Sequence, residues 1–123
     1  MIFECVLYYV IDYFYTKIKH YLKMKNSIRE ELQNYIQELK QDNVLTTENK
    51  EDWHYYAFNE SYYIIGYYNA EEWLKKHNLS PFKAVQEVRE YEMNNFGEMN
   101  TELNSEAIVN MLVYIYGEEI IYN

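Results

Sequence analysis

Helix start and stop signals constrain the fold of this chain more than any other feature of its sequence. Ser27 with Glu30, and Asn69 with Glu72, have the spacing of a capping box, in which two side chains bond free backbone N–H groups at a helix start. Apolar residues three or four positions apart follow each signal, which predicts two amphipathic helices. These residues are Ile28, Leu32, Tyr35, Ile36 and Leu39 in the first segment, and Ala70, Trp73, Leu74 and His77 in the second.

A third helix is predicted to begin at residue 81. Ser80 is a suitable N-cap and Pro81 a suitable first helical residue, because proline lacks an N–H that would stay unpaired there. Gly97 suits the left-handed conformation in which many helices end. The residues expected to face inward are Val85, Val88 and Tyr91.

Two apolar segments carry competing signals. Residues 53–58 are predicted to form a short helix ending at Asn59, and residues 62–65 a short strand ending at Gly66, because aromatic and β-branched residues favour strands. Residues 108–116 fit a buried helix or a core strand, and the helix start at Ser105 favours the helix. With a loop at residues 42–49, the sequence predicts a mainly α, small single-domain helical fold with one or two short strands.

The length and the apolar content indicate one folded domain. A chain of 123 residues fits a single domain, and 49% apolar residues supply enough core to make disorder unexpected. We expect residues 24–123 to form a single acidic globular domain. The single cysteine, Cys5, cannot form an intramolecular disulfide. Together with the lack of a secretion signal, this indicates a reducing cytoplasm.

Residues 1–23 form a segment of their own. Apolar residues recur at helical spacing there, which predicts an amphipathic N-terminal helix. Charged residues interrupt the pattern too often for a membrane span, and the segment lacks the cleavage site of a signal peptide. Two interpretations stay open: a helix that docks on the domain, or a dispensable segment ahead of a translation start at Met24.

Charge is distributed unevenly along the chain. The formal net charge is −9. Residues 1–25 hold two carboxylates and four lysines, a net charge of +2, whereas residues 26–123 hold the other 18 carboxylates and seven cations, a net charge of −11. Such a surface repels nucleic acid and attracts basic partners. The tyrosine pairs at 62–63 and 67–68 could stack bases, but such platforms also need a basic groove, so no direct nucleic-acid binding is expected.

The 16 tyrosines indicate a protein-binding surface. Tyrosine combines a large apolar face with a hydroxyl that tolerates water, and it costs little conformational entropy to order. An acidic, tyrosine-rich chain is therefore expected to bind a basic protein. Its oligomeric state does not follow from the sequence.

Residues that commonly carry out catalysis are scattered along the chain. The three glycines are too far apart for a phosphate-binding loop. Glu51 and His54 have Glu-x-x-His spacing, but a di-iron site needs a second such pair and two further glutamates. We therefore expect no catalytic residues, no metal and no cofactor. The alternative of a small hydrolase or metal-binding enzyme would involve His54 or His77.

Three motifs resemble a family of small phage-encoded proteins. They are Tyr-Ile-Ile-Gly at 63–66, Asn-Phe-Gly-Glu at 95–98, and Val-Asn-Met at 109–111 followed by Tyr-Ile-Tyr-Gly-Glu at 114–118. The resemblance covers roughly residues 51–121 and leaves out the segment before Met24. It implies a phage or prophage origin, and hence the cytoplasm of a host bacterium, but it assigns no activity and no site.

The resemblance and the charge together suggest an inhibitor of a host defence complex. We expect a phage-encoded acidic protein that binds a nucleic-acid-handling complex, most specifically an anti-CRISPR protein that acts as a nucleic-acid mimic, because CRISPR effectors hold nucleic acid in cationic channels. A phage accessory or morphogenetic protein, with the N-terminal helix as its contact surface, is the alternative. The expected partner-binding residues are Glu87, Glu90, Tyr91, Glu98, Glu102, Glu106, Tyr114 and Tyr116.

Overall fold

The computed structural model describes residues 27–99 and 103–122 of the chain. The predicted helix at 1–23, Met24, Cys5 and Glu102 lie outside the described residues. Within the described part there is no β-strand, and the elements are helices joined by short loops. The mainly α prediction is therefore confirmed, and the predicted strand is wrong.

Residues 27–41 form the first described helix. Ile28, Leu32 and Ile36 lie on its buried side, as their four-residue spacing predicts. Tyr35 and Leu39 pack against the core from the edges of that side. A loop then leads to a short 3₁₀ turn, η1 (Lys50–Asp52). The loop is held by side-chain bonds, among them the Asn49 amide donating to the Val44 carbonyl over 2.9 Å.

Helix α2 (Trp53–Tyr68) runs without a break through the segment predicted as a helix, a turn and a strand. Trp53, Ala57 and Ile64 are buried at helical spacing, so burial of one helical side outweighs the strand preference of the Tyr-Tyr-Ile-Ile stretch. Gly66 lies inside the helix and does not end it. The helix ends at Asn69, whose positive φ of 65° turns the chain into α3 (Ala70–Lys76).

The predicted N-caps of α3 and α4, Asn69 and Ser80, are confirmed. The Asn69 side chain accepts a hydrogen bond from the Glu71 N–H at the start of α3. Helix α4 (Pro81–Phe96) begins with Pro81 after Ser80, whose hydroxyl accepts from the Lys83 N–H over 3.3 Å. It ends at Gly97, which has the left-handed φ of 70° that glycine adopts without strain.

Helix α5 (Ser105–Tyr122) settles the open choice at residues 108–116 in favour of the helix. Its first turn is capped by Asn104, which accepts from the Ala107 N–H over 2.8 Å. Most of the apolar positions of α5 are buried, so it is the central helix of the core. The buried residues are Ile108, Val109, Leu112, Val113, Tyr116, Gly117 and Ile121.

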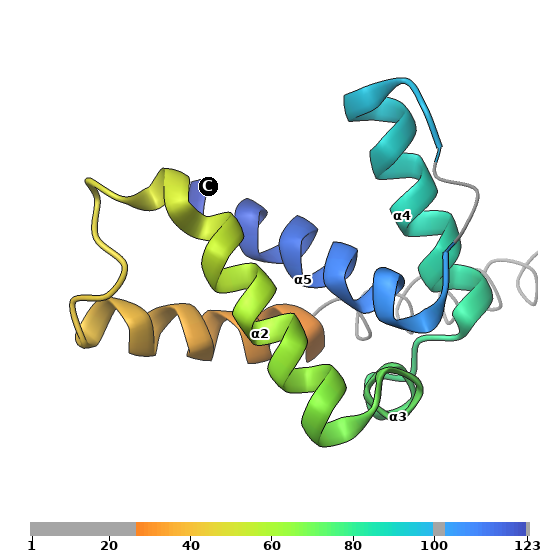
Figure 1. The fold of residues 1–123 in the computed structure, drawn as a ribbon, viewed down its shortest axis with the longest axis horizontal. Helices are drawn as coiled ribbons and strands as arrows, with labels where there is room; N and C mark the ends of the chain where they lie inside the picture. The colour runs from red at the N-terminus through yellow and green to blue at the C-terminus, as the bar shows by residue number, and fades with distance from the viewer. Residues whose placement is uncertain (1–26, 100–102, 123) are drawn as a thin grey trace, which may run out of the picture.

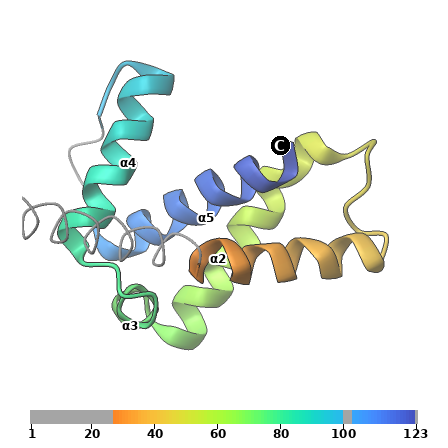
Figure 2. The same cartoon turned by 180° about the vertical axis from the view of Figure 1, so that it is seen from behind.

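The helices pack around α5. Both views of the ribbon show α2 crossing α5 and the helix of residues 27–41, while α4 extends away from this group (Figures 1 and 2). Helices α2 and α5 approach each other closely at Gly117, where an added methyl group would overlap the indole ring of Trp53. Packing toward α5 thus buries one side of α2 and leaves the opposite side in solvent.

Candidate protein-binding surface

The outward side of α2 is aromatic. Five large aromatic side chains of this helix are between 57% and 73% exposed. We call them the α2 aromatic face: Tyr55, Phe58, Tyr62, Tyr63 and Tyr67. Contiguous exposed apolar surface of this kind marks an interaction site more often than scattered single residues do.

Neighbouring rings of the α2 aromatic face stack along the helix. The ring centroids of Phe58 and Tyr62 are 6.4 Å apart with planes 26° from parallel, and those of Tyr63 and Tyr67 are 5.7 Å apart with planes 8° from parallel. Residues four apart are neighbours on a helix surface, so the backbone sets this contact. Because the rings already restrict one another, binding a partner costs less side-chain entropy.

The exposed side of α2 carries no Asp, Glu, Lys or Arg. The one such residue in the helix is Glu60, which is half-buried. Desolvation, with the charges of Glu31 and Glu38, raises the pKa of Glu60 to about 7. Since Glu31 and Glu38 belong to the helix of residues 27–41, Glu60 lies on the side of α2 toward that helix. The α2 aromatic face is therefore uncharged within a chain of net charge −9.

Charged residues flank the α2 aromatic face at its two ends. Glu51 and Asp52 are exposed just before α2. The first turn of α3, just after it, contains two further glutamates. Lys76 in the last turn of α3 has its Nζ 4.7 Å from the centroid of the Tyr68 ring. Lys76 thus makes a cation–π contact with Tyr68, a residue of α2 next to the α2 aromatic face.

The residues predicted from sequence to bind the partner do not all lie on the surface. Tyr116 is 3% exposed, so it is a core residue, and its hydroxyl donates to the half-buried carboxylate of Glu87. The ring of Tyr116 also lies under the guanidinium of Arg29, 5.7 Å from its centroid. The expectation that Tyr116 is an exposed anchor is therefore corrected: α5 is the central helix and turns this ring inward.

Tyr91 and Tyr114 are half-buried near Glu118, between α4 and α5. The Tyr91 hydroxyl donates to Glu118 over 3.1 Å. Desolvation, with the hydrogen bond to Glu118 and its charge, raises the pKa of Tyr91 to about 12. Desolvation and the charge of Glu118 also raise the pKa of Tyr114. The bond from Tyr91 to Glu118 joins α4 to α5, whereas Tyr114 and Glu118 both belong to α5.

The predicted carboxylates are spread over different parts of the surface. Glu90 lines a cavity with Glu87 and Arg29 beside α4, and Glu98 is exposed beyond the end of that helix. Glu106 is at the start of α5, in a cavity with Asn69 at the end of α2. These three carboxylates belong to different elements, and Glu102, the other member of the predicted row, lies outside the described residues.

A buried polar cluster joins the helix of residues 27–41 to α3. His77, 3% exposed, has its Nε2 2.5 Å from Glu31 Oε2 and its Nδ1 2.7 Å from Ser27 Oγ. The Trp73 indole donates to the same carboxylate over 3.2 Å. Burial alone would raise the pKa of Glu31, but the bonds from His77 and Trp73 outweigh it and hold this pKa below its usual value.

The cluster contains the residue types of a Ser–His–acid hydrolase, but in a different arrangement. In such hydrolases the serine bonds Nε2 and the carboxylate bonds Nδ1, whereas here the two nitrogens are exchanged. The imidazole is also closed to solvent. Ser27, predicted as an N-cap with Glu30, is the first described residue of its helix, and its hydroxyl bonds His77. We interpret the cluster as a structural link between two helices.

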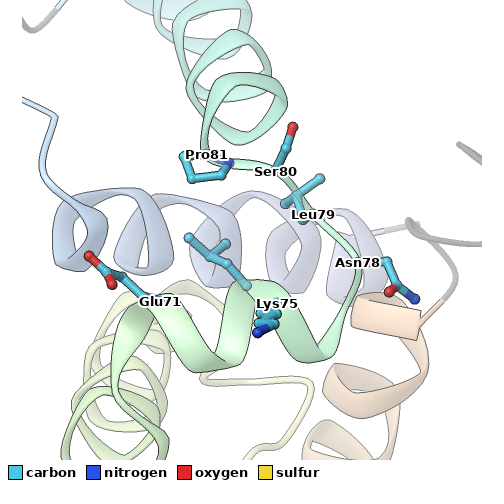
Figure 3. A pocket seen from close by; sticks show the side chains of 7 residues that line it. Glu71, Lys75, Asn78, Leu79, Ser80 and Pro81 are labelled. Atoms are coloured by element: carbon cyan, nitrogen blue, oxygen red, sulfur yellow. The ribbon is translucent and has the colours of Figure 1, made fainter.

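A cavity of about 600 Å³ lies where α3 turns into α4 (Figure 3). Leu74, Leu79 and Pro81 give it apolar walls. Polar side chains of Glu71, Lys75, Asn78 and Ser80 complete its lining. Glu51 and His54, the pair with metal-ligand spacing, lie far along the chain from this cavity, and His54 is exposed. Among the described residues, no group of three His, Cys, Asp or Glu side chains is placed to hold a metal ion.

Comparison with protein-family models, curated proteins and solved structures finds no match to this chain. None of the helices in residues 27–99 and 103–122 has the length and apolar content needed to cross a membrane.

The α2 aromatic face was missed by sequence reasoning because residues 62–65 were assigned to a strand. A signal for it does exist. Trp53, Ala57 and Ile64 continue a helical spacing across the segment, and a helix with this register places five aromatic residues on its other side.

Proposed function

We propose that this protein binds a basic host protein through the α2 aromatic face and thereby inhibits it. The observation that carries the proposal is one helical side with five exposed aromatic rings and no charge. Exposing the apolar rings of tyrosine and phenylalanine to water is unfavourable in free energy, and aromatic residues are enriched in protein interfaces.

The partner is proposed to be a protein because the α2 aromatic face lacks the cations that nucleic acid requires. Proteins that stack bases on aromatic residues combine them with a positively charged groove. Here the exposed side of α2 contains neither Lys nor Arg, and acidic residues precede the helix. Phosphates would be repelled from this surface, whereas a basic protein would be attracted to it.

The size of the face sets its role in the complex. A helix of 16 residues is about 24 Å long, and a stable interface covers about 800 Å² on each partner. One helical side is too small to supply that area. We therefore assign the central, water-excluding contact to the aromatic rings and a polar rim to the carboxylates around them, including Glu51 and Asp52.

The proposed target class is a nucleic-acid-handling defence complex, specifically a CRISPR effector. The net charge of −9 and the resemblance to phage-encoded proteins support this class. Such effectors hold nucleic acid in cationic channels that an acidic protein can enter. Exposed carboxylates such as Glu90, Glu98 and Glu106 would contact those cations and take the place of phosphates.

The test is a phage-restriction assay combined with site-specific crosslinking. A host with an active CRISPR system, expressing this protein, is challenged with a phage that the system targets. Restored plaque formation supports the proposal, and continued restriction against each CRISPR type tested contradicts the proposed target class. A photo-crosslinking residue at Tyr62 should capture an effector subunit, whereas the same residue at Gln37, exposed on another helix, should not.

A further inference from the structure

We infer that the α2 aromatic face recognises arginine side chains of its partner, and that Gly66 provides the space in which a guanidinium group lies. The inference rests on the proposed function for the statement that this face binds a protein. It adds the chemistry of the group that is bound.

Gly66 is unexplained by the fold. It lies within α2, where glycine costs about 1 kcal/mol relative to alanine. Its φ is not positive, so the backbone does not require glycine. A methyl group built on Gly66 would have nothing within 4 Å, so packing does not require glycine either. A destabilising residue without a structural reason indicates a functional one.

The position of Gly66 is in the middle of the aromatic side. Tyr62 and Tyr63 are four and three residues earlier, and these spacings place them next to Gly66 on the helix surface. Both rings are exposed, by 73% and 57%. The Tyr63 ring is stacked on Tyr67 in the following turn, whereas Tyr62 is stacked on Phe58 in the preceding turn. Because Gly66 has no side chain, an incoming group can reach the ring of Tyr62 from the direction of the following turn.

The exposed aromatic rings around Gly66 favour the binding of a guanidinium group. It is planar and weakly hydrated, so it stacks on aromatic rings and is also attracted to their electron-rich faces. The α2 aromatic face has no cation of its own to compete for this position. Lys76, which lies 4.7 Å from the centroid of the neighbouring Tyr68 ring, shows the same type of contact within the chain. The chain's net charge of −9 would draw a basic segment to the surface.

The experiment titrates the full chain with three peptides of equal length, built from glycine alternating with arginine, lysine or citrulline. Binding is followed by NMR shifts of the tyrosine ring signals. The arginine peptide should shift the signals of Tyr62, Tyr63 and Tyr67 and bind at least threefold more tightly than the lysine peptide. The citrulline peptide, which keeps the shape but loses the charge, should bind at least tenfold more weakly than the arginine peptide.

Gly66→Leu should reduce arginine-peptide affinity to that of the lysine peptide, and the matched control Gln86→Leu, on the exposed side of α4, should leave it unchanged. Gly66→Ala serves where the leucine variant folds poorly: it should raise the melting temperature and still weaken arginine-peptide binding. Equal affinity for the arginine and lysine peptides, or unchanged arginine binding in the Gly66 variants, would overturn the inference. So would a concentration-dependent dimer that is lost in Tyr62→Ser, because a second copy would then occupy the face.

The inference and the proposed function can fail separately. If Tyr62→Ser abolishes capture of the effector while the Gly66 variants and the peptide series show no preference for arginine, the proposed function stands and the arginine inference is wrong. If Tyr62→Ser leaves effector binding intact, the proposed function is wrong regardless of the peptide results.

Discussion

The tyrosines of α2 and those between α4 and α5 belong to the same residue type but have different surroundings. The hydroxyl groups of Tyr91 and Tyr116 donate to the carboxylates of Glu118 and Glu87, and Tyr116 is 3% exposed. Tyr62, by contrast, is 73% exposed and contacts another ring of its own helix. The first group fixes one helix on another, and the second is available to a partner. Tyrosine content alone therefore does not locate a binding surface.

The two helical glycines give the largest expected effect. Gly117→Leu places a side chain where the Trp53 ring already lies, so α5 cannot keep its packing on α2. We expect a loss of about 3 kcal/mol or more in the free energy of unfolding, measured by urea denaturation. Gly66→Leu, in open space on the other side of the same helix pair, is the control and should not destabilise the fold. Equal stability of the two variants would disprove this packing of α2 on α5.

The second prediction separates binding from folding. Changing Tyr62, Tyr63 and Tyr67 together to serine should weaken partner binding about 100-fold, or about 2.7 kcal/mol, because the central rings of the interface are lost. The rings are exposed, so the melting temperature should change little. Calorimetric titration of the captured partner measures the effect. Phenylalanine at the same three positions, which keeps the rings, should retain most of the affinity.

The third prediction is a change that lowers stability and leaves binding unchanged. Tyr116→Phe removes the hydroxyl that donates to Glu87 without creating a cavity. We expect a cost of about 1–2 kcal/mol in unfolding free energy, since a partly buried carboxylate loses a donor, and unchanged partner affinity. A large loss of binding with normal stability would show that Tyr116 contacts the partner.

The fourth prediction concerns the exposed carboxylates. Replacing Glu90, Glu98 and Glu106 with glutamine should leave stability nearly unchanged, because all three are exposed. If they contact the cations of the target, affinity should fall by less than tenfold, about 1.4 kcal/mol, and the difference from wild type should shrink in high salt. Identical affinity and salt dependence in the variant would remove these residues from the interface.

The smallest effect is expected from the single carboxylate of α2. Burial and the neighbouring charges raise the pKa of Glu60 from 4.5 to about 7, so the folded state binds a proton more tightly than the unfolded state. Stability should therefore decrease as pH rises from about 4.5 to 7, on the order of 1 kcal/mol for a half-buried group. Glu60→Gln should lack this decrease and exceed wild-type stability at pH 8. Parallel stability–pH curves for the two proteins would show that Glu60 is solvated.

Local signals predicted much of the helical framework. Ser80, Pro81 and Gly97 act through bonds and dihedral angles within a few residues, so their roles at the ends of α4 could be assigned from sequence. The Asn104 cap of α5 was missed, because it lies next to an equally suitable Ser105. The strand at 62–65 was predicted from the local strand preference of aromatic and β-branched residues. Packing outweighs this preference, because a helix buries Ile64 in the core.

The candidate binding surface could not be derived in the same way. Helix α5 is apolar on most sides, so its sequence pattern does not say whether Tyr114 or Tyr116 faces the core. The prediction that Tyr116 is an exposed anchor is wrong for this reason. The contacts of His77 with Ser27 and Glu31 join residues up to 50 positions apart, so no local sequence spacing predicts them.

The sequence by itself determined the helical class, the caps of α3 and α4, and the acidic character, because these follow from neighbouring residues and from composition. Which tyrosines face solvent was decided only by the tertiary structure. The physical reason is the close approach of Trp53 to Gly117, which sets the side of α2 that is buried against α5. Once that side is fixed, helical geometry leaves Tyr55, Phe58, Tyr62, Tyr63 and Tyr67 on the other.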